Sequence, residues 1–216
     1  MRSARSVLMD APPGSVVAVI GAPGTGKSRA VKAAAAAGAW PRRVVYEPHA
    51  RRDRIEEARG RKLYPWPGSL VSIRDLMRRP DLLDSDPLAL VVDPAGLDAV
   101  SMGRDFGTLA RLAWHTGDLT IIAEEAAIYA RQALEAATLI STGGRHAGLR
   151  LIAISQSWTR IPLDVRRCVS DVIAFAQSEP RDVDELGRKC GRDFAERVRR
   201  LSSGAIPCTW RQGDAG

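Results

Sequence analysis

The sequence predicts an α/β fold, a mostly parallel central sheet with helices on both faces. Three observations lead to this prediction. Short apolar runs bounded by turn residues alternate with Ala-rich or amphipathic stretches along the chain. Aromatic residues make up only 5% of the 216 residues, so the core must consist mainly of Ala, Val, Leu and Ile. The hydrophobic fraction of 45% and the charged fraction of 26% are typical of a globular domain and exclude a disordered chain.

The predicted elements follow one another in a regular order. Buried strands are predicted where apolar runs are continuous, at 15–20, 43–46, 70–73, 88–92, 119–123, 149–155 and 172–176. Helices are predicted through 33–37 up to Gly38, in part of 50–62, over 105–115 and over about 126–140. Strands that alternate with helices are typical of a parallel sheet buried on both faces.

The chain is expected to be a single domain over residues 1–216. Residues 1–14 are interpreted as an N-terminal extension, and about 200–216 as a peripheral strand and tail, because both ends are loosely patterned. The sequence contains no run of eighteen apolar residues, so no membrane span is predicted, and the N-terminus does not resemble a signal peptide. The three cysteines lack metal-ligand spacing, so reduced thiols in a cytosol are expected.

The balance of charge permits a polyanionic partner. Lys and Arg number 32 against 25 acidic residues, which gives a net charge of +7. A positive field raises the local concentration of phosphates, although the excess of Arg can also reflect base composition in the genome. The segment 50–62 is a possible DNA-facing patch or simply a solvated helix, and its basic residues are Arg51, Arg52, Arg54, Arg59, Arg61 and Lys62.

The loop after the first strand carries the strongest motif in the chain. It fits GxxxxGK[ST] and stands between a predicted strand and a predicted helix, which is the context that this phosphate-binding loop requires. Its backbone N–H groups can point at phosphate oxygens, Lys27 can reach the β- and γ-phosphates, and the Ser28 hydroxyl can ligate Mg²⁺. ATP and Mg²⁺ are therefore the expected ligands. The predicted nucleotide-binding residues are Gly21, Ala22, Pro23, Gly24, Thr25, Gly26, Lys27, Ser28 and Arg29.

Two strand ends are candidates for the position of the carboxylate that holds the metal. Asp93 follows the strand 88–92, and its use would fit a small-molecule kinase. Glu124 and Glu125 follow the strand 119–123. Here Glu124 would face the metal and Glu125 would polarise the attacking water, as in a hydrolase. The acidic pair can also be read as a solvated helix start.

Two further side chains are candidates for the same chemistry. Gln156 stands at the tip of the strand 149–155, where it could hydrogen-bond the attacking water or the γ-phosphate. Arg145 lies in a glycine-rich turn before that strand and is a candidate arginine finger for a neighbouring subunit, or else an ordinary surface arginine.

In these motifs the sequence resembles the FtsK/HerA superfamily of DNA-pumping ATPases, and within it the small genome-packaging ATPases of membrane-containing, tailless viruses. The resemblance covers roughly 15–180 in the correct order. Its segments are GAPGTGKS (21–28), LALVVDP (88–94), LTIIAEEA (119–126), GGRHAGLRLIAISQS (143–157) and SDVIAFAQSEPRDVDEL (170–186).

The resemblance implies a role for each matching residue. Lys27 and Ser28 take the P-loop roles, Glu125 is the catalytic glutamate, Arg145 the trans-acting arginine and Gln156 the polar sensor. Glu124 departs from the family, which usually has Asp there, so the reach to the Mg²⁺ shell differs.

The resemblance also implies an ATPase that packages viral double-stranded DNA into a capsid. It implies a homo-oligomeric ring, a hexamer or a pentamer, with nucleotide at the subunit interfaces and capsid or portal-vertex proteins as docking partners. The expected location is the host cytoplasm, with association with the virion at the packaging vertex as a further expectation.

Three other functions stay open at this point. One is a filamentous-phage assembly ATPase of the zonula-occludens-toxin type, which usually has a membrane span. Another is the small-molecule kinase that would use Asp93. The third, an AAA+ remodelling protein, is disfavoured because little chain follows Gln156 for a helical lid.

Overall fold

The structure is a computed structural model that describes residues 2–60, 65–96 and 98–213. Its eight-stranded sheet has the order β3-β4-β2-β5-β6-β1-β7-β8, and every neighbouring pair is parallel except β7 with β8. The strands are β1 Val16–Ile20, β2 Arg42–Tyr46, β3 Ser69–Ser72, β4 Leu88–Asp93, β5 Thr120–Ala123, β6 Arg150–Ser155, β7 Asp171–Ala174 and β8 Cys208–Arg211. The α/β fold with a mostly parallel sheet is confirmed.

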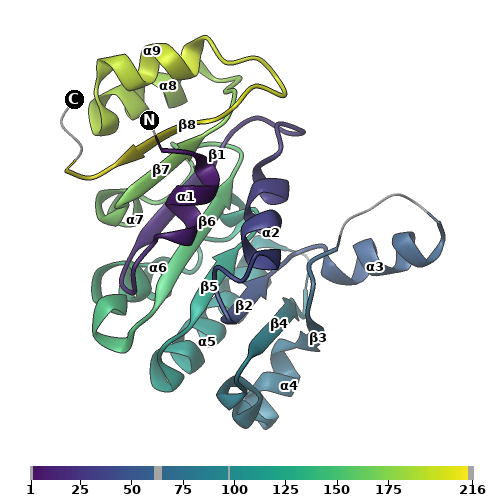
Figure 1. Cartoon of the computed structure of the whole chain (residues 1–216). Coiled ribbons are helices and arrows are strands. Elements are labelled where there is room, and N and C mark those ends of the chain that lie inside the picture. Colours follow the sequence, from purple (N-terminus) through teal and green to yellow (C-terminus); the bar gives the residue numbers. More distant parts are fainter. Residues whose placement is uncertain (1, 61–64, 97, 214–216) are drawn as a thin grey trace.

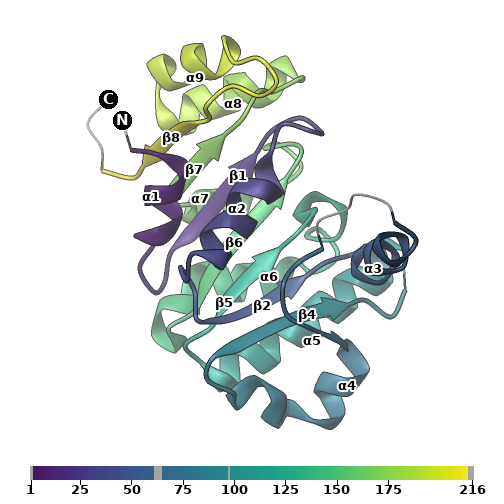
Figure 2. The ribbon, with the colours of Figure 1, turned by 45° about the vertical axis from the view of Figure 1, so that its right-hand side comes forward.

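Helices cover both faces of this sheet (Figure 1). They are α1 Ala4–Met9, α2 Lys27–Ala36, α3 Ala50–Ala58, α4 Ile73–Arg78, α5 Ala99–Thr116, α6 Leu134–Thr138, α7 Leu163–Cys168, α8 Pro180–Cys190 and α9 Arg192–Arg199. The two views show α1 and α2 on one face and α5 and α6 on the other (Figure 2). None of the helices in the described ranges is long and apolar enough to cross a bilayer.

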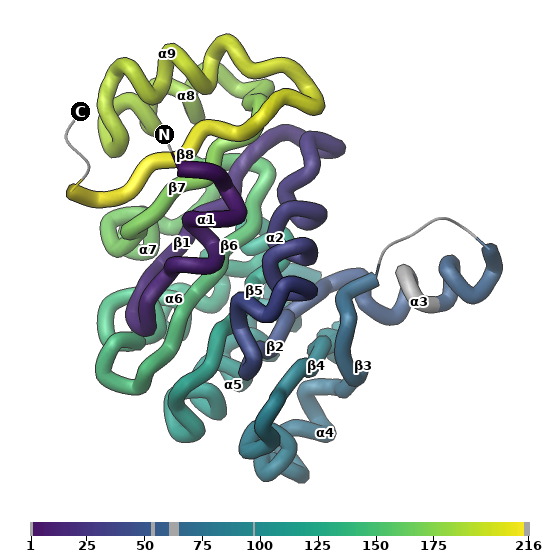
Figure 3. The backbone as a smooth tube through the Cα atoms, in the orientation of Figure 1, coloured from purple at the N-terminus to yellow at the C-terminus, as the bar shows by residue number. Residues whose placement is uncertain are grey.

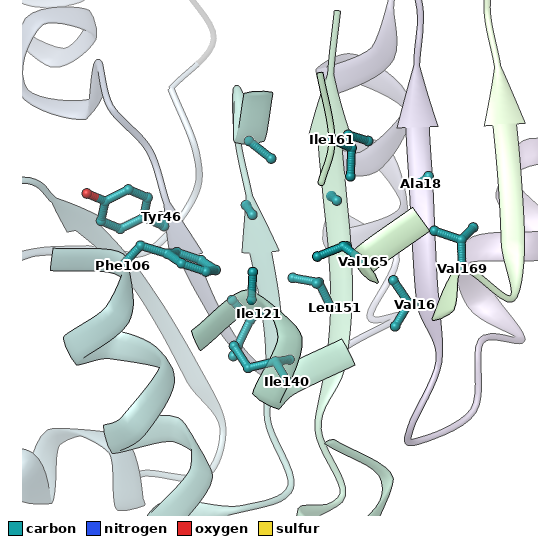
Figure 4. Packing of buried hydrophobic residues seen from close by; sticks show 14 of the residues in the cluster. Val16, Ala18, Tyr46, Phe106, Ile121, Ile140, Leu151, Ile161, Val165 and Val169 are labelled. Carbon is teal, nitrogen blue, oxygen red and sulfur yellow. The ribbon is translucent and has the colours of Figure 1, made fainter. Parts of the chain in front are cut away.

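The alternation of side chains along each buried strand divides the core into two layers. In β1, Val17 and Val19 face the layer of α1 and α2, whereas Val16 and Ala18 face the larger layer of α5 and α6. Figure 4 shows the larger layer, in which strand side chains such as Leu151 point toward the helices. Because both faces are buried, the strands are continuous apolar runs, which is why the sequence reveals them.

The N-terminal and C-terminal segments lie side by side (Figure 1). In α1, Val7 and Leu8 are buried in the same layer as α2. The Thr209 hydroxyl in β8 donates to the Arg2 carbonyl at 2.6 Å. Residues 2–14 and 200–213 therefore contact one another, although the two segments are far apart in the sequence.

The predicted continuous helix over 126–140 is wrong. The chain forms a 3₁₀ turn over Ala126–Ile128, then α6, then a π turn over Leu139–Gly143. Inside this range the backbone leaves the helical conformation at Tyr129, with φ −123° and ψ −11°, and again at Ala133, with φ −107° and ψ 27°. Tyr129 is fully buried, and its ring lies 4.9 Å from that of Tyr46. A regular helix therefore does not run through Tyr129 and Ala133.

The helix predicted at 105–115 begins earlier than expected. It starts at Ala99, because the Asp98 carboxylate caps it by accepting hydrogen bonds from the backbone N–H groups of Val100 and Ser101. Its predicted buried face is confirmed, and includes Phe106, Leu109, Ala110 and Ala113.

Candidate nucleotide-binding and catalytic site

The glycine-rich loop lies where the parallel strand β1 leads into α2, at the carboxyl edge of the sheet (Figure 1). Gly24 and Gly26 have φ values of 74° and 99°, a backbone conformation that side chains disfavour. A Cβ on Gly21 would lie 2.6 Å from the Phe175 Cβ. The glycines thus permit both the left-handed turns and the close packing that the loop requires.

Lys27 is 7% exposed, and its ammonium group lies at the mouth of this loop. Its Nζ donates to the Gly21 carbonyl at 2.7 Å and to the Ala22 carbonyl at 2.8 Å. Burial lowers the pKa of Lys27, while the charges of Glu125 and Glu124 act in the opposite direction. The loop therefore holds a positive group beside two carboxylates, as a site for a phosphate and a cation requires.

Glu124 ends β5 and is 3% exposed. The Ser28 hydroxyl donates to Glu124 Oε2 at 3.1 Å, and the Trp66 indole N–H donates to Oε1 at 3.1 Å. Burial raises the pKa of Glu124, whereas the bond from Ser28, the charge of Lys32 and the bond from Trp66 oppose that rise. Ser28 and Glu124 bring two hard oxygen donors together, so these residues fit Mg²⁺.

Glu125 and Gln156 complete the cavity in front of the loop. The Gln156 Nε2 lies 3.0 Å from each carboxylate oxygen of Glu125 and donates to them. The cavity has a volume of about 330 Å³ and is lined by Pro23, Gly24, Gly26, Lys27, Ser28, Arg29, Glu125 and Gln156. Residues predicted from three separate motifs therefore meet at one place.

Asp93 lies outside this cavity. Its strand β4 is separated from β1 by β2, β5 and β6. Its Oδ2 lies 3.1 Å from the Arg51 Nε, so its charge is already paired. The kinase interpretation needs Asp93 beside the phosphate loop, and this geometry opposes it.

Arg145 lies at the other edge of the sheet, in a 3₁₀ turn over Gly144–Ala147 that leads into β6. It is exposed, and its Nε lies 3.4 Å from the His146 Nε2. It lines a second cavity of about 330 Å³ with Gly14, Asp171 and Arg211. Strand β6 has six residues at roughly 3.3 Å each, so about 20 Å of sheet separates Arg145 from the phosphate loop of its own chain.

The basic segment over 50–62 falls mainly in α3, which extends from the body of the molecule beyond β3 (Figure 3). Arg51 pairs with Asp93, and Arg59 pairs with Glu56 at 3.1 Å. The Arg54 side chain, Arg61 and Lys62 lie outside the described part of the chain.

Two side chains that bond to buried carboxylates near these cavities have no signal in the sequence. Trp66 contacts Glu124, yet it stands 58 positions before it in the chain and belongs to no motif. Arg211 donates through Nε to the Asp171 carboxylate at 2.5 Å, and Asp171 is only 1% exposed. Both contacts depend on how distant segments pack, which local patterns do not encode.

No family model matches the sequence, and no curated protein matches it. Among solved structures, the DNA-packaging ATPase B204 from Sulfolobus turreted icosahedral virus has a TM-score of 0.63 at 20% identity, covering 89% of this chain and 90% of that one. The chain has a P-loop NTPase fold.

Other solved structures share this P-loop NTPase fold. The genome-packaging NTPase B204 from Sulfolobus turreted icosahedral virus 2, in complex with AMPPCP, gives a TM-score of 0.63 at 17% identity, covering 88% of this chain and 89% of that one. VirB4 of Thermoanaerobacter pseudethanolicus gives 0.55 at 12% identity, covering 90% of this chain and 87% of that one. The expected likeness to the small packaging ATPases is confirmed at the level of the fold.

Proposed function

We propose that this P-loop NTPase hydrolyses ATP to pump double-stranded DNA, with the packaging of a viral genome into a capsid as its task. The observation that carries the proposal is the position of Glu124 and Glu125, which bring a buried metal-binding oxygen and a second carboxylate to the phosphate loop. The shared fold with two B204 packaging proteins supports the same function.

In the proposed reaction the loop backbone and Lys27 bind the β- and γ-phosphates. Ser28 and Glu124 would hold Mg²⁺, which supplies charge neutralisation on the phosphate oxygens when bound. Glu125 accepts a proton from the attacking water, whose oxygen forms a bond to the γ-phosphorus. The bond from that phosphorus to the bridging oxygen breaks, and ADP and phosphate leave. Gln156 orients Glu125 through the bonds that it donates to its carboxylate.

The proposal includes a ring of identical chains, a hexamer or a pentamer. Arg145 lies at the opposite edge of the sheet from the phosphate loop. It can reach a γ-phosphate only if that nucleotide is bound to a neighbouring copy. Capsid or portal-vertex proteins are the proposed docking partners, in the host cytoplasm or on the virion.

The test combines ATPase rates with sedimentation, each with and without a long DNA duplex. We expect the duplex to stimulate hydrolysis and a ring to form. Glu125→Gln should bind ATP but hydrolyse it on the order of 10²-fold more slowly, because it removes the proton acceptor. Glu179→Gln, the same change at an exposed position outside the cavity, is the matched control. A strictly monomeric chain that transfers phosphate to a small acceptor without DNA would refute the proposal.

A further inference from the structure

A groove lies between α5 and the segment 131–136. The helices α5 and α6 lie on the face of the sheet opposite α2 (Figure 2). Its volume is about 570 Å³. Arg104 and Arg111 on α5 line one wall, and Arg131 lines the other. All three side chains are exposed, and Glu135 is the acidic residue that also lines the groove.

The three arginines keep their charge uncompensated. Within the ranges that the structure describes, none of them forms an ion pair. Some other surface arginines are paired, as Arg188 is with Glu185 and Arg199 with Asp184, whereas single arginines such as Arg74 and Arg78 are also unpaired in the described ranges. What distinguishes the groove is that three unpaired arginines line one cavity. A groove with three unpaired guanidinium groups attracts a polyanion rather than a neutral partner.

Two glycines on α5 set the depth of the groove. A Cβ on Gly103 would lie 2.5 Å from the Gln132 Cβ, and one on Gly107 would lie 3.8 Å from the Ala136 Cβ. The segment 131–136 therefore packs closely on the backbone of α5.

The arginines on α5 are spaced for separate phosphates. Arg104 and Arg111 are two helical turns apart, which is about 10.5 Å along the axis of α5. At this separation the two guanidinium groups contact different phosphates of a duplex rather than a single one. Guanidinium groups bind phosphate oxygens in a fixed fork geometry.

Hydrogen bonds also connect the groove to the end of β5, where Glu124 and Glu125 lie. The Tyr129 hydroxyl donates to the Glu124 carbonyl at 3.0 Å, and the backbone N–H of Gln132 donates to the Tyr129 carbonyl at 3.0 Å. Arg131 stands between these two anchored residues. A shift of Glu124 or Glu125 during hydrolysis would therefore be transmitted to one wall of the groove.

We propose that this groove contacts the phosphate backbone of double-stranded DNA, a role that rests on the proposed function and assigns its DNA-binding surface. This assignment differs from the basic segment over 50–62, where Arg51 and Arg59 are already paired with acids. Contacts of this kind are independent of base sequence, as a pump that must move any DNA requires.

The experiment compares two triple variants of the full chain. The groove variant carries Arg104→Ala, Arg111→Ala and Arg131→Ala, and the control carries Arg74→Ala, Arg78→Ala and Arg181→Ala, which removes the same charge from exposed positions. Binding to a fluorescent 30-base-pair duplex is measured at several salt concentrations. The groove variant should bind about 10- to 100-fold more weakly, and the slope of log affinity against log salt should fall by about 2 to 3. Its ATPase rate without DNA should stay at the wild-type value.

The outcomes separate this inference from the function on which it rests. If the wild-type chain neither binds nor responds to duplex, both the inference and the proposed function fail. If the wild-type ATPase is stimulated by duplex and the groove variant is stimulated and binds equally, only the inference fails. A third triple variant carries Arg51→Ala, Arg52→Ala and Arg59→Ala. If it loses DNA binding while the groove variant binds normally, the DNA-binding surface is α3 and the inference fails.

Discussion

The two edges of the central sheet carry polar groups in different states. At the carboxyl edge the groups bond to one another, Lys27 to loop carbonyls, Glu124 to Ser28, and Glu125 to Gln156. At the amino edge Arg211 pairs with the buried Asp171, whereas the Arg145 side chain is exposed and, within the described residues, hydrogen-bonds only to the adjacent imidazole. The carboxyl edge thus gathers the groups that the proposed phosphate site requires, and the amino edge presents an exposed arginine.

This difference suggests how catalysis would be tied to assembly. If the cavity at the carboxyl edge binds ATP and Mg²⁺ as proposed, one more positive charge would stabilise the transition state of hydrolysis. That charge lies about 20 Å away along β6 in the same chain. If a second copy supplies it, hydrolysis becomes fast only where two chains meet.

Lys27→Ala should have the largest effect at the carboxyl edge. It removes the ammonium group from the phosphate loop, so that ATPase activity should fall to background and ATP affinity should fall strongly. ATP binding by calorimetry and phosphate release measure the two effects. Lys189→Ala, which removes a lysine in α8 that bonds to the Arg167 carbonyl away from the loop, is the control. Retained turnover in Lys27→Ala would show that the loop is not the phosphate site.

Arg145→Ala should have the next largest effect, although it touches nothing at the carboxyl edge of its own chain. Loss of a trans-acting arginine is expected to lower kcat by about 10³-fold. Mixing Arg145→Ala with Lys27→Ala should restore part of the activity, because one chain then supplies the intact loop and the other the intact arginine. If no mixture recovers activity, Arg145 does not act across an interface.

Arg211 shares the second cavity with Arg145, but it should affect stability rather than turnover. Its Nε bonds to Asp171, which is 1% exposed and accepts one further bond, from Ser170 at 2.9 Å. Arg211→Leu would leave this buried carboxylate without its charged partner, at a cost of about 3 kcal/mol in the free energy of unfolding.

Urea denaturation measures this difference between the two arginines. Arg145→Ala should unfold at the wild-type urea concentration because its side chain is exposed. Adding Asp171→Asn to Arg211→Leu should recover part of the lost stability, since the buried charge is then absent. Equal stability of Arg211→Leu and the wild type would contradict the structural role.

The sequence predicts the carboxyl edge well because its residues lie in local patterns. The apolar strands are continuous, the glycine motif follows the first of them, and Glu124 and Gln156 each stand at a strand end. Strands that run parallel bring such ends to the same edge, so adjacency in space follows from position along each strand. The roles of these residues remain predictions. That Gln156 and Glu125 line one cavity with the loop, and that Ser28 bonds to Glu124, are structural findings.

What the sequence does not predict is the order of the strands and the packing between distant segments. Nothing local indicates that β6 lies between β1 and β5, and this order decides that Glu124 rather than Asp93 faces the phosphate loop. The break of the helix after Glu125 likewise depends on a buried place for Tyr129 beside Tyr46. The position of Trp66 is the third example, and it leads to the smallest predicted effect.

Trp66→Phe tests whether the carboxyl edge depends on this indole for its fine geometry. Trp66 is 3% exposed, and its indole N–H donates to Glu124 Oε1. The Lys32 Nζ lies 5.1 Å from the centre of the Trp66 ring. Phe keeps most of the packing but removes the N–H, so Oε1 would be buried without its donor. Because that bond opposes the rise in the pKa of Glu124, its loss should raise the pKa further.

The measurement is the pH dependence of kcat/KM. A metal-binding carboxylate must be ionised, so activity falls as the pH drops through the pKa of Glu124. In Trp66→Phe this acidic limb should move to higher pH, and the loss of activity should become smaller as the pH rises. Trp66→His, which can keep an N–H donor, should restore part of the shift. An unchanged acidic limb in Trp66→Phe would mean that Trp66 serves the core alone and that Glu124 is oriented by Ser28.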